Sequence, residues 1–504
     1  MISAPSRSAS SEKSATKARA RQTPTSAWHG ATVSGYRAIS RETWAPRISR
    51  QDLRGGSMKV ADLHVAQVSP REVSAGAEKV AHQLHRQYTA RGVDSWLVVA
   101  EKQTDDPKVI ELSNDSYRPA WTRALWRVAD SLPESGAYHL LDRALRTIAD
   151  PLRMLQIQRG IETISYPASA HIPALVPESL DVLHLHNLHG DYFDLRALPR
   201  LNALVPTIYT LHDAWPLTGH CAYPMQCEKW RTGCGDCEYL DRYVGIRRDG
   251  SAHNARIKRK ALTDSGVRLA TPSRWLMQMA EESGVAGLSA ETRVIPNGVD
   301  TTVFSPGDKV AARALLGLPT DATIVLYTAR SAKDNPYKGF ETLEAALPLI
   351  AEQTQGDKLL FLAIGQDAPA YMLGDARVQF VPFVSDEATV AAYYRAADLY
   401  LHPSHAENHS LALLEAMASG LSIVSSDAGG NPEIVEDGVT GRVFANRDAS
   451  ALAEATVQLI RSPETRNRYV AAGVPRARER FTIERQVSAY LDWYLEITAS
   501  RQRG

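Results

Sequence analysis

Two glutamates, Glu407 and Glu415, are separated by seven intervening residues within the stretch HPSHAENHSLALLEAMASG, residues 402–420. The apolar run ADLYLHPS (397–404) predicts a buried strand, and Ser410 is a favoured N-cap for a helix that a later glycine ends. Glu407 is then expected in the loop before the helix, and Glu415 within it. The free N–H groups of a helix N-terminus suit a phosphate or diphosphate, and carboxylates beside such a site could hold sugar hydroxyls. The alternative interpretation is that both glutamates are ordinary solvated charges.

Two cations and a pair of glycines are predicted at neighbouring strand ends in the same half of the chain. Arg330 ends the apolar run TIVLYTAR, and Lys338 precedes a glycine at the start of a helical pattern. Two cations at one sheet edge are what a diphosphate leaving group needs, although either cation alone would fit an ordinary surface charge. Gly429 and Gly430 form a turn after the next strand and add backbone groups to the same edge.

Histidines follow two apolar runs in the first half of the chain. His186 and His189 follow one run, and His212 and Asp213 follow the other. Ligands of open α/β sheets bind beyond the carboxyl ends of the strands, so these residues are candidates for a site. A single histidine is more often structural. Gly76 opens a helix in the first strand–helix–strand unit and would let a ligand approach the backbone, although no G-x-G-x-x-G is present.

The four cysteines of the chain lie close together in sequence, at Cys221, Cys227, Cys234 and Cys237. This spacing favours one tetrahedral structural Zn²⁺ that ties a loop together. The alternatives are a redox pair and reduced thiols in a packed loop. A catalytic zinc is not expected, because four thiolates would fill every coordination position.

Strands and helices alternate throughout the chain, which predicts an α/β fold with doubly wound parallel sheets. We expect two Rossmann-like domains that face a cleft. The expected segments are a disordered or mis-started extension (1–57), a first, acceptor-side domain (58–298) with the Cys-rich loop (220–238), a second, donor-binding domain (299–481) and a final helix (482–500) that returns to the first domain.

Composition excludes several other classes of protein. The 504 residues are 44% hydrophobic and 23% charged with a formal net charge of zero, so a general nucleic-acid binder is disfavoured. No apolar run is long enough to span a membrane, and the clustered cysteines are not a secreted disulfide scaffold, so a cytoplasmic protein is expected.

One basic helical segment, residues 115–160, has two interpretations. Trp121, Leu125, Val128 and Leu132 fall on one face of its first helix, with arginines beside them. Such a helix could lie on an anionic membrane surface, as a peripheral contact at the inner face of the membrane. The alternative is an ordinary surface helix packed on the domain.

Taken together, these segments resemble the retaining glycosyltransferases of family 4, whose two-domain architecture is called GT-B. The most specific match is E-N-H-S-L-A-L-L-E (407–415), which is similar to the Glu-x7-Glu motif of that family. The supporting matches, in the family's order, are S-A-G-A-E-K-V (74–80), T-L-H-D (210–213), P-S-R-W (272–275), P-N-G-V-D (296–300), A-R with K-G (329–330, 338–339) and A-G-G-N-P-E (428–433). The resemblance covers roughly residues 58–497.

The resemblance implies a role for each matching residue. Glu407 would contact the transferred sugar, and Glu415 would hold the ribose of a nucleotide-diphosphate sugar donor. Arg330 and Lys338 would neutralise the leaving diphosphate, and His212 would lie by the reacting carbon. The other donor contacts would be Gly76, Asn408, His409, Ser410, Leu411, Gly429 and Gly430, and the acceptor side would include His186, His189 and Asp213. Such enzymes need no metal cofactor for the chemistry.

The chain departs from the commonest family pattern in the Asn-His-Ser that follows Glu407, in the long spacer between Arg330 and Lys338, and in the inserted cysteine stretch. Similar features occur in bacterial exopolysaccharide and colanic-acid-type transferases. The expected function is therefore sugar transfer with retention to a glycan or a polyprenyl-diphosphate-linked saccharide, in exopolysaccharide or cell-envelope polysaccharide synthesis. The alternatives are a GT-B-shaped sugar-nucleotide epimerase or phosphorylase, and an inactive scaffold of a polysaccharide-synthesis complex.

Overall fold

A computed structural model describes residues 59–502, except 74–75, 134–135, 137 and 163–164. The predicted extension, residues 1–57, lies outside the described residues.

The first sheet is formed by β1 (His64–Arg71), β2 (Asp94–Glu101), β3 (Val109–Glu111), β4 (Val182–Leu185), β5 (Thr207–Thr210), β6 (Arg268–Thr271) and β7 (Thr292–Val294). The strands are all parallel, in the order β3-β2-β1-β4-β5-β6-β7. The helices of this half are α1 (Ala77–Ala90), α2 (Ala120–Asp130), α3 (His139–Ala149), α4 (Pro151–Gln158), α5 (Ile172–Leu175), α6 (Leu198–Leu204), α7 (Ser251–Ser265) and α8 (Arg274–Glu282).

The second sheet is formed by β8 (Thr323–Thr328), β9 (Leu359–Ile364), β10 (Tyr371–Leu373), β11 (Ala376–Val381), β12 (Leu399–His402), β13 (Ser422–Ser426) and β14 (Gly441–Phe444). Their order is β10-β11-β9-β8-β12-β13-β14, and only the β10–β11 pair among these is antiparallel. The accompanying helices are α9 (Lys309–Leu316), α10 (Phe340–Gln353), α11 (Glu387–Ala396), α12 (Leu411–Ala418), α13 (Asn431–Ile434), α14 (Ala449–Arg461), α15 (Pro463–Arg480) and α16 (Ile483–Gln502).

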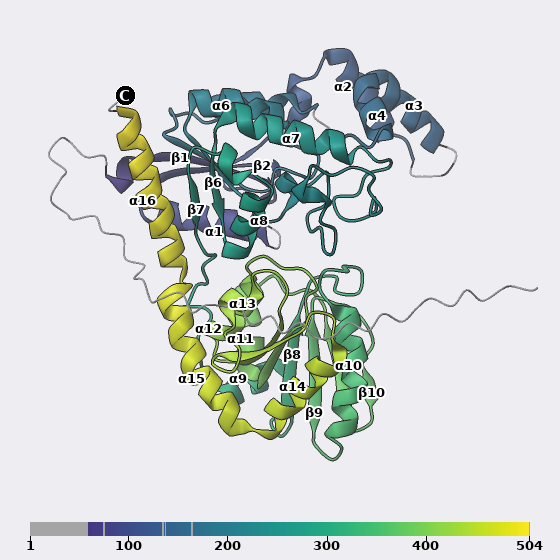
Figure 1. The fold of residues 1–504 in the computed structure, drawn as a ribbon, viewed down its shortest axis with the longest axis vertical. Helices are drawn as coiled ribbons and strands as arrows, with labels where there is room; N and C mark the ends of the chain where they lie inside the picture. Colours follow the sequence, from purple (N-terminus) through teal and green to yellow (C-terminus); the bar gives the residue numbers. More distant parts are fainter. Residues whose placement is uncertain (1–58, 74–75, 134–135, 137, 163–164, 503–504) are drawn as a thin grey trace, which may run out of the picture. The chain divides into compact units, whose positions relative to one another are not determined.

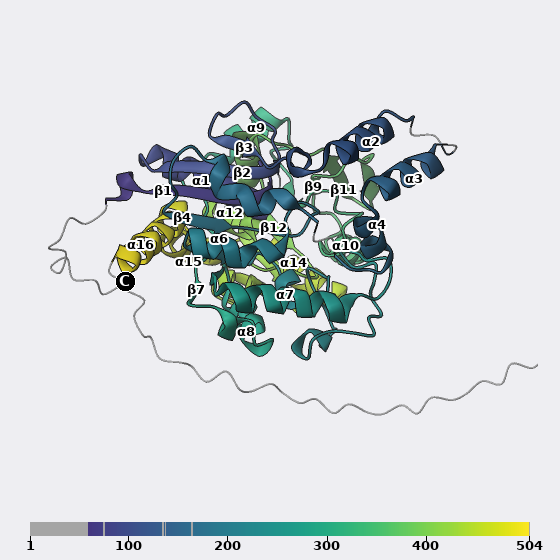
Figure 2. The same cartoon turned by 90° about the horizontal axis from the view of Figure 1, so that it is seen from above.

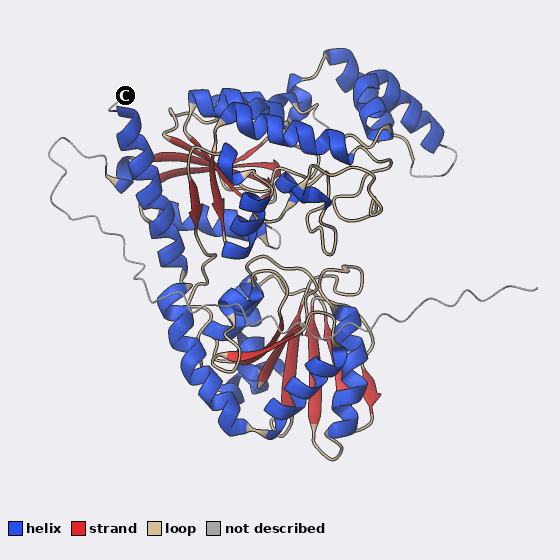
Figure 3. Ribbon diagram, viewed as in Figure 1, coloured by secondary structure: helices blue, strands red, loops and turns tan. Residues whose placement is uncertain are grey.

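The predicted two-domain, doubly wound α/β fold is confirmed, and Figure 3 shows helices packed against the strands of both sheets. Every residue of the central strands β4, β5, β9, β12 and β13 is buried, which explains why they read as continuous apolar runs. The expected domain boundaries stay predictions.

The last helix, α16, packs against the first sheet although it follows the second one in sequence (Figure 1). Its buried face shares a hydrophobic cluster with Leu63 and Val65 of the β1 region, Tyr88 of α1, and residues of β4 and β5. The tyrosines also make polar contacts, because the hydroxyls of Tyr88 and Tyr494 lie 3.2 Å apart. The face contains Ile483, Val487, Tyr490, Leu491, Trp493, Tyr494 and Ile497.

The helices α2, α3 and α4 form an outlying group beside the first sheet, as both views show (Figures 1 and 2). Trp121 and Val128 of α2, which the sequence placed on one apolar face, are 52% and 50% exposed. One of the two expectations was that this face packs on the domain. At these two side chains it does not.

Candidate functional site

Glu407 lies just beyond the carboxyl end of β12, in the loop that leads to α12. The Lys338 ammonium is 3.1 Å from one of its carboxylate oxygens, and the His402 ring is 3.8 Å from the same oxygen. Burial raises the pKa of the Glu407 carboxyl, but the Lys338 charge and hydrogen bond outweigh burial, so the pKa lies below its usual range. Glu407 is therefore an anion at neutral pH, with a cation held beside it.

Glu415 lies inside α12 and is 8% exposed. Its two oxygens have separate partners: Lys79 of α1 lies 2.8 Å from one, and the Tyr394 hydroxyl donates to the other at 3.2 Å. Lys79 also pairs with Glu387 at 2.9 Å. Burial lowers the pKa of Lys79, but the two carboxylates overcome this and raise it above its usual range. The carboxylate expected to hold a ribose is thus paired with a lysine from the first half of the chain.

The loop between Glu407 and α12 is tied to the first half of the chain. The Asn408 amide donates to the backbone oxygen of His212 at 3.0 Å, and Ser273 donates to Asn408 in turn. The His409 ring packs against Phe481, with ring centroids 5.5 Å apart, and burial lowers its pKa to about 3. The side chains of Asn408 and His409 therefore hold the loop in place. Their expected contacts with the donor stay predictions.

Two glycines let the turn after β13 pack directly on this loop. Gly429 has a φ of 57°, and a Cβ there would lie 1.8 Å from the backbone oxygen of Glu407. A Cβ on Gly430 would lie 1.9 Å from the backbone oxygen of Asn408. Any side chain at either position would displace the loop that carries Glu407. Ser410 caps α12, which begins at Leu411, and its hydroxyl accepts a backbone N–H at 3.4 Å.

A buried line of hydrogen-bonding side chains runs along the carboxyl edge of the first sheet. Nε2 of His212 lies 2.9 Å from Nδ1 of His186, whose other nitrogen lies 3.1 Å from the Gln67 amide oxygen. Burial lowers the pKa of His212 to about 4 and that of His186 well below its ordinary value. The two predicted histidines lie together, and both are neutral. His212 can therefore donate or accept a hydrogen bond without carrying a charge.

His189 and Asp213 form a second pair at the same edge, with 2.8 Å between nitrogen and oxygen. Burial lowers the pKa of His189, but the Asp213 carboxylate reverses this and raises it above the ordinary value. The Asp213 pKa is lowered, because His189 and the Trp215 N–H outweigh the effect of burial. The pair is therefore ionic under conditions in which His212 is neutral.

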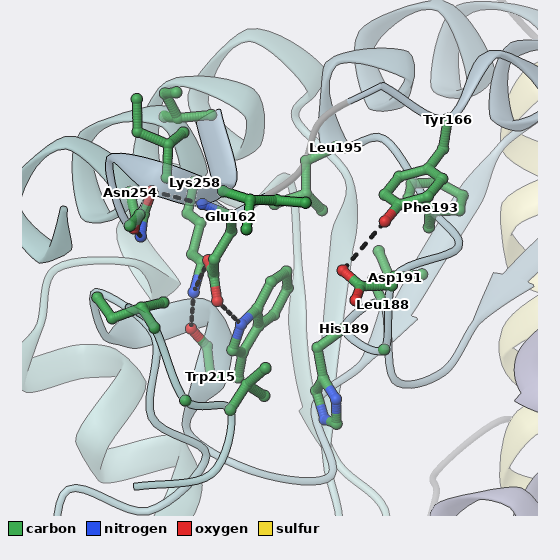
Figure 4. Close-up of a pocket in the computed structure, with 18 of the residues that line it drawn as sticks. Glu162, Tyr166, Leu188, His189, Asp191, Phe193, Leu195, Trp215, Asn254 and Lys258 are labelled. Carbon is green, nitrogen blue, oxygen red and sulfur yellow. Dashed lines mark hydrogen bonds and ion pairs between the residues drawn. The ribbon is translucent and has the colours of Figure 1, made fainter. Parts of the chain in front are cut away.

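A cavity of about 210 Å³ opens beside this pair (Figure 4). His189 and Trp215 line one part of it, and a Glu162–Lys258 ion pair at 2.8 Å lines another. Lys258 also donates to the backbone oxygen of Trp215 at 2.9 Å, and the Trp215 ring N–H donates to Glu162. This network fixes the segment that follows His212 and Asp213.

Two other predicted residues are placed differently from Lys338. Arg330 is exposed after β8, with its guanidinium 4.8 Å from the centre of the Phe383 ring, and it forms no ion pair with Glu407. Gly76 begins α1 with a φ of 68°, and a Cβ there would meet no described atom within 4 Å. The close approach of a ligand to Gly76 stays a prediction.

The predicted zinc site is not supported. Within the described ranges, no group of three or more histidine, cysteine or acidic side chains is arranged to hold a metal ion. Cys221, Cys227, Cys234 and Cys237 line one small space and are free thiols. The sulfur of Cys234 accepts the Gly219 N–H at 3.1 Å, and that of Cys237 lies 3.3 Å from the His220 ring. The sulfurs of Cys234 and Cys237 are thus engaged with neighbouring protein groups.

A larger cavity, of about 450 Å³, has Glu407 in its lining. Asp427, Gly429 and Asn446 contribute from the strand ends of the second sheet, and α8 and the cysteine loop contribute from the first half of the chain. Tyr223 of the loop lines it, and its ring lies 5.3 Å from that of Tyr337. Burial, followed by the charges of Glu407 and Asp213, raises the pKa of the Tyr223 hydroxyl well above its ordinary value.

Sequence reasoning missed Lys79, Tyr223 and Tyr394. Lys79 stands in the segment 74–80 that resembles the family, so the sequence marked the segment but not its contact with Glu415. Tyr394 lies on a helix whose pattern is apolar, and Tyr223 lies in an insertion, so neither carried a recognisable spacing.

Comparison with known families identifies both halves of the chain. A model described as glycosyltransferase family 4 matches residues 74–303, and one described as glycosyl transferases group 1 matches residues 322–462.

Curated relatives include a D-inositol 3-phosphate glycosyltransferase from Geodermatophilus obscurus, 35% identical over 42% of this chain and 50% of that protein. The phosphatidyl-myo-inositol mannosyltransferase of Mycobacterium leprae is 30% identical over 60% of this chain and 70% of that protein. The chain thus spans about half the length of the first relative and 70% of the second.

Solved structures with a similar fold include sucrose-phosphate synthase from Thermosynechococcus elongatus, with a TM-score of 0.57 at 20% identity over 87% of this chain and 100% of that one. Anabaena HepE in complex with UDP-glucose has a TM-score of 0.52 at 17% identity, over 87% of this chain and 100% of that one. At these identities the likeness concerns the fold alone.

Proposed function

The chain belongs to the family 4 glycosyltransferases, and from this premise we propose that it transfers a sugar from a nucleotide-diphosphate donor to an acceptor hydroxyl with retention of configuration. The observation that carries the proposal is the ionised Glu407 beside Lys338 at the edge of the second sheet, with Glu415 one loop and one helix turn further along. HepE and its bound UDP-glucose make uridine donors the first to test.

The proposed reaction uses charge stabilisation and orientation. The bond between the sugar's anomeric carbon and the diphosphate oxygen breaks, and its electron pair leaves with the diphosphate. Lys338 is placed to neutralise that charge, and the N-terminus of α12 adds its free N–H groups. The acceptor oxygen bonds to the same face of the carbon, and its proton passes to the departing diphosphate oxygen. Neutral His212 orients the reacting groups by a hydrogen bond.

The acceptor has two candidate chemistries. The departures from the common family pattern favour a lipid-linked saccharide in exopolysaccharide or cell-envelope polysaccharide synthesis. The names of the two relatives favour an inositol derivative. Both are hydroxyl-rich rings, and both can be presented at the inner face of a membrane. The structure contains no helix, within its described residues, that is long and apolar enough to cross a bilayer.

The decisive experiment replaces Glu407 by alanine. Thermal-shift screening against UDP-, GDP- and ADP-sugars first identifies the donor, because binding to the folded state raises the midpoint. Glu407→Ala is expected to remove sugar transfer while the protein stays folded. Glu344→Ala is the control, because Glu344 is exposed on α10 and lines none of the cavities described above.

Full transfer activity in Glu407→Ala would contradict the assignment. NMR of the product's anomeric centre tests retention separately, and an inverted product would overturn that part alone. Conversion of the donor with no acceptor incorporated would favour the epimerase alternative. A wild-type protein that binds no donor would favour the scaffold alternative.

A further inference from the structure

The cysteine loop, an insertion that the sequence led us to interpret as a metal-bound staple, forms one wall of the cavity that contains Glu407. Tyr223, Gln226, Glu228 and Arg231 of the loop line this cavity. Facing them across it are Glu407 and the ends of β13 and β14. The loop is therefore placed to touch whatever occupies the space next to the reacting carboxylate.

Along the second sheet, this cavity lies at different strand ends from the expected position of the diphosphate. Lys338 follows β8, and the sheet continues from β8 to β12, β13 and β14. Glu407 follows β12, whereas Asp427 follows β13 and Asn446 follows β14, and all three line the cavity. The cavity thus extends from Glu407 away from the strand that leads to the cation. A molecule that meets the transferred sugar from this direction would be the acceptor.

The wall is held in place by ion pairs between the loop and α8. Arg231 lies 2.8 Å from Glu228 in the loop and 2.8 Å from Glu282 of α8. Trp275 and Gln278 of α8 complete this side of the cavity. Aromatic faces and alternating amide, carboxylate and guanidinium groups suit the apolar faces and hydroxyl edges of a saturated polyol ring.

Tyr223 carries the most direct functional signal in the wall. Its ring contacts Tyr337, and Glu407 and Asp213 are its electrostatic neighbours. Its side chain is partly buried in the cavity wall, and no hydrogen bond joins its hydroxyl to a described residue. A protonated hydroxyl in the lining that also contains Glu407, with a spare donor and acceptor, is suited to a ligand hydroxyl.

We propose that this cavity is the acceptor subsite, that it takes the hydroxyl-rich ring of a saccharide or an inositol, and that Tyr223 binds a ring hydroxyl there. The proposal rests on the proposed glycosyl transfer and adds the class of acceptor and the wall that recognises it. The inserted loop then determines acceptor specificity, while the donor is held by residues of the second sheet.

The test compares two identical substitutions in one loop. Tyr223→Phe removes a hydroxyl from a residue that lines the cavity together with Glu407, and Tyr239→Phe removes one from a residue that lines the small space between the cysteines. The probes are UDP-glucose and GDP-mannose as donors, with methyl α-glucoside, methyl α-mannoside and D-inositol 3-phosphate as acceptors. Acceptor KM, donor dissociation constant and donor hydrolysis without acceptor are measured for each protein.

Tyr223→Phe is expected to raise acceptor KM about fivefold, the effect of one neutral hydrogen bond, with donor affinity and donor hydrolysis unchanged. Tyr239→Phe is expected to match wild type in all three measurements. Gln226→Ala, an exposed position on the same wall, is expected to raise acceptor KM without a change in thermal midpoint. The acceptor whose KM responds identifies the ring as sugar or inositol.

Unchanged acceptor KM in both Tyr223→Phe and Gln226→Ala would overturn the subsite. A changed donor affinity in Tyr223→Phe would assign the cavity to the donor sugar instead, which also overturns it. Failure of the glycosyltransferase proposal gives a different result, because the wild-type protein would then neither bind nor hydrolyse any nucleotide sugar.

Discussion

At the scale of single residues, Glu415 shows how a carboxylate is prepared for a ligand before the ligand arrives. Lys79 and Tyr394 each hold one of its oxygens, which fixes the orientation of the carboxylate inside the protein. Lys79 reaches it from α1, the helix that Gly76 begins. Lys79 therefore links Glu415, the carboxylate expected to hold the ribose, to the helix that Gly76 begins.

Lys79→Met is expected to weaken donor binding by roughly tenfold and to lower the free energy of unfolding by about 2 kcal/mol, because Glu415 and Glu387 lose a partly buried charged hydrogen-bond partner. Isothermal titration with the donor and urea unfolding measure the two effects. Lys260→Met is the matched control, because Lys260 is 76% exposed and pairs only within its own helix. Donor affinity equal to that of the control would contradict the role of Lys79.

Sequence spacing was sufficient to find Glu407 and Glu415, because they stand on one continuous strand–loop–helix segment. It could not find the partners of Glu415, because Lys79 is 336 residues away in the chain and only the folded sheets bring the two together. The same reason applies to Tyr223. The cysteine spacing shows which residues can bind a metal but not where their sulfurs point, and the structure does not support the predicted zinc site.

At the scale of elements, the group α2–α4 stands out by its exposed apolar side chains. Leu140 and Ile148 of α3 are 78% and 61% exposed, and Leu152 of α4 is 62% exposed. Exposed arginines, among them Arg127 and Arg143, stand between them. This combination of apolar and cationic side chains is typical of helices that lie in the interface of an anionic bilayer, and it supports the proposed peripheral membrane contact.

The double variant Leu140→Ser/Leu152→Ser is expected to reduce binding to phosphatidylglycerol vesicles more than tenfold, because two large apolar groups no longer enter the interface. Vesicle co-sedimentation of the full chain measures this. Val310→Ser/Leu315→Ser on α9 is the control, because those side chains are equally exposed, at 65% and 77%, outside the group. Wild-type protein that stays in the supernatant, or equal losses in both variants, would refute the contact.

At the scale of the whole molecule, several histidines are buried in the neutral form near the site. Burial lowers the pKa of His184 and His409 to about 3, and that of His212 and His402 to about 4. The unfolded chain protonates these side chains near their ordinary value of 6.5. Below that pH, these histidines therefore take up protons when the chain unfolds. His189, whose pKa is raised in the folded protein, has the opposite effect and offsets this uptake only in part.

Stability is accordingly expected to be complete above about pH 6.5 and to fall as the pH drops toward about 4, with each histidine costing about 1.4 kcal/mol for every pH unit in that window. Urea unfolding at a series of pH values measures the slope. His184→Asn, which removes one of the four, is expected to flatten the curve relative to the wild type. A free energy of unfolding that stays constant over this window would disprove the expectation.

The order of the central strands and their helices was predictable from the sequence, because buried parallel strands are long apolar runs between helical patterns. The edge strands β3, β7, β10 and β14 were not predicted, since they are short and only partly buried and so do not read as continuous apolar runs. The sequence predicted a final helix, but only the structure shows which residues contact its buried face of Val487, Tyr490 and Tyr494.

The position of α16 has a consequence for how the chain is made. Leu63, Val65, Val182 and Ile208 leave the ribosome long before Trp493 and Tyr494, the side chains that share their hydrophobic cluster. At about 5–20 residues per second, translation leaves that apolar surface uncovered for roughly 15–60 seconds. The nascent first half must either bury it provisionally or be guarded by a chaperone, because the helix that covers it is synthesised only after the whole second sheet.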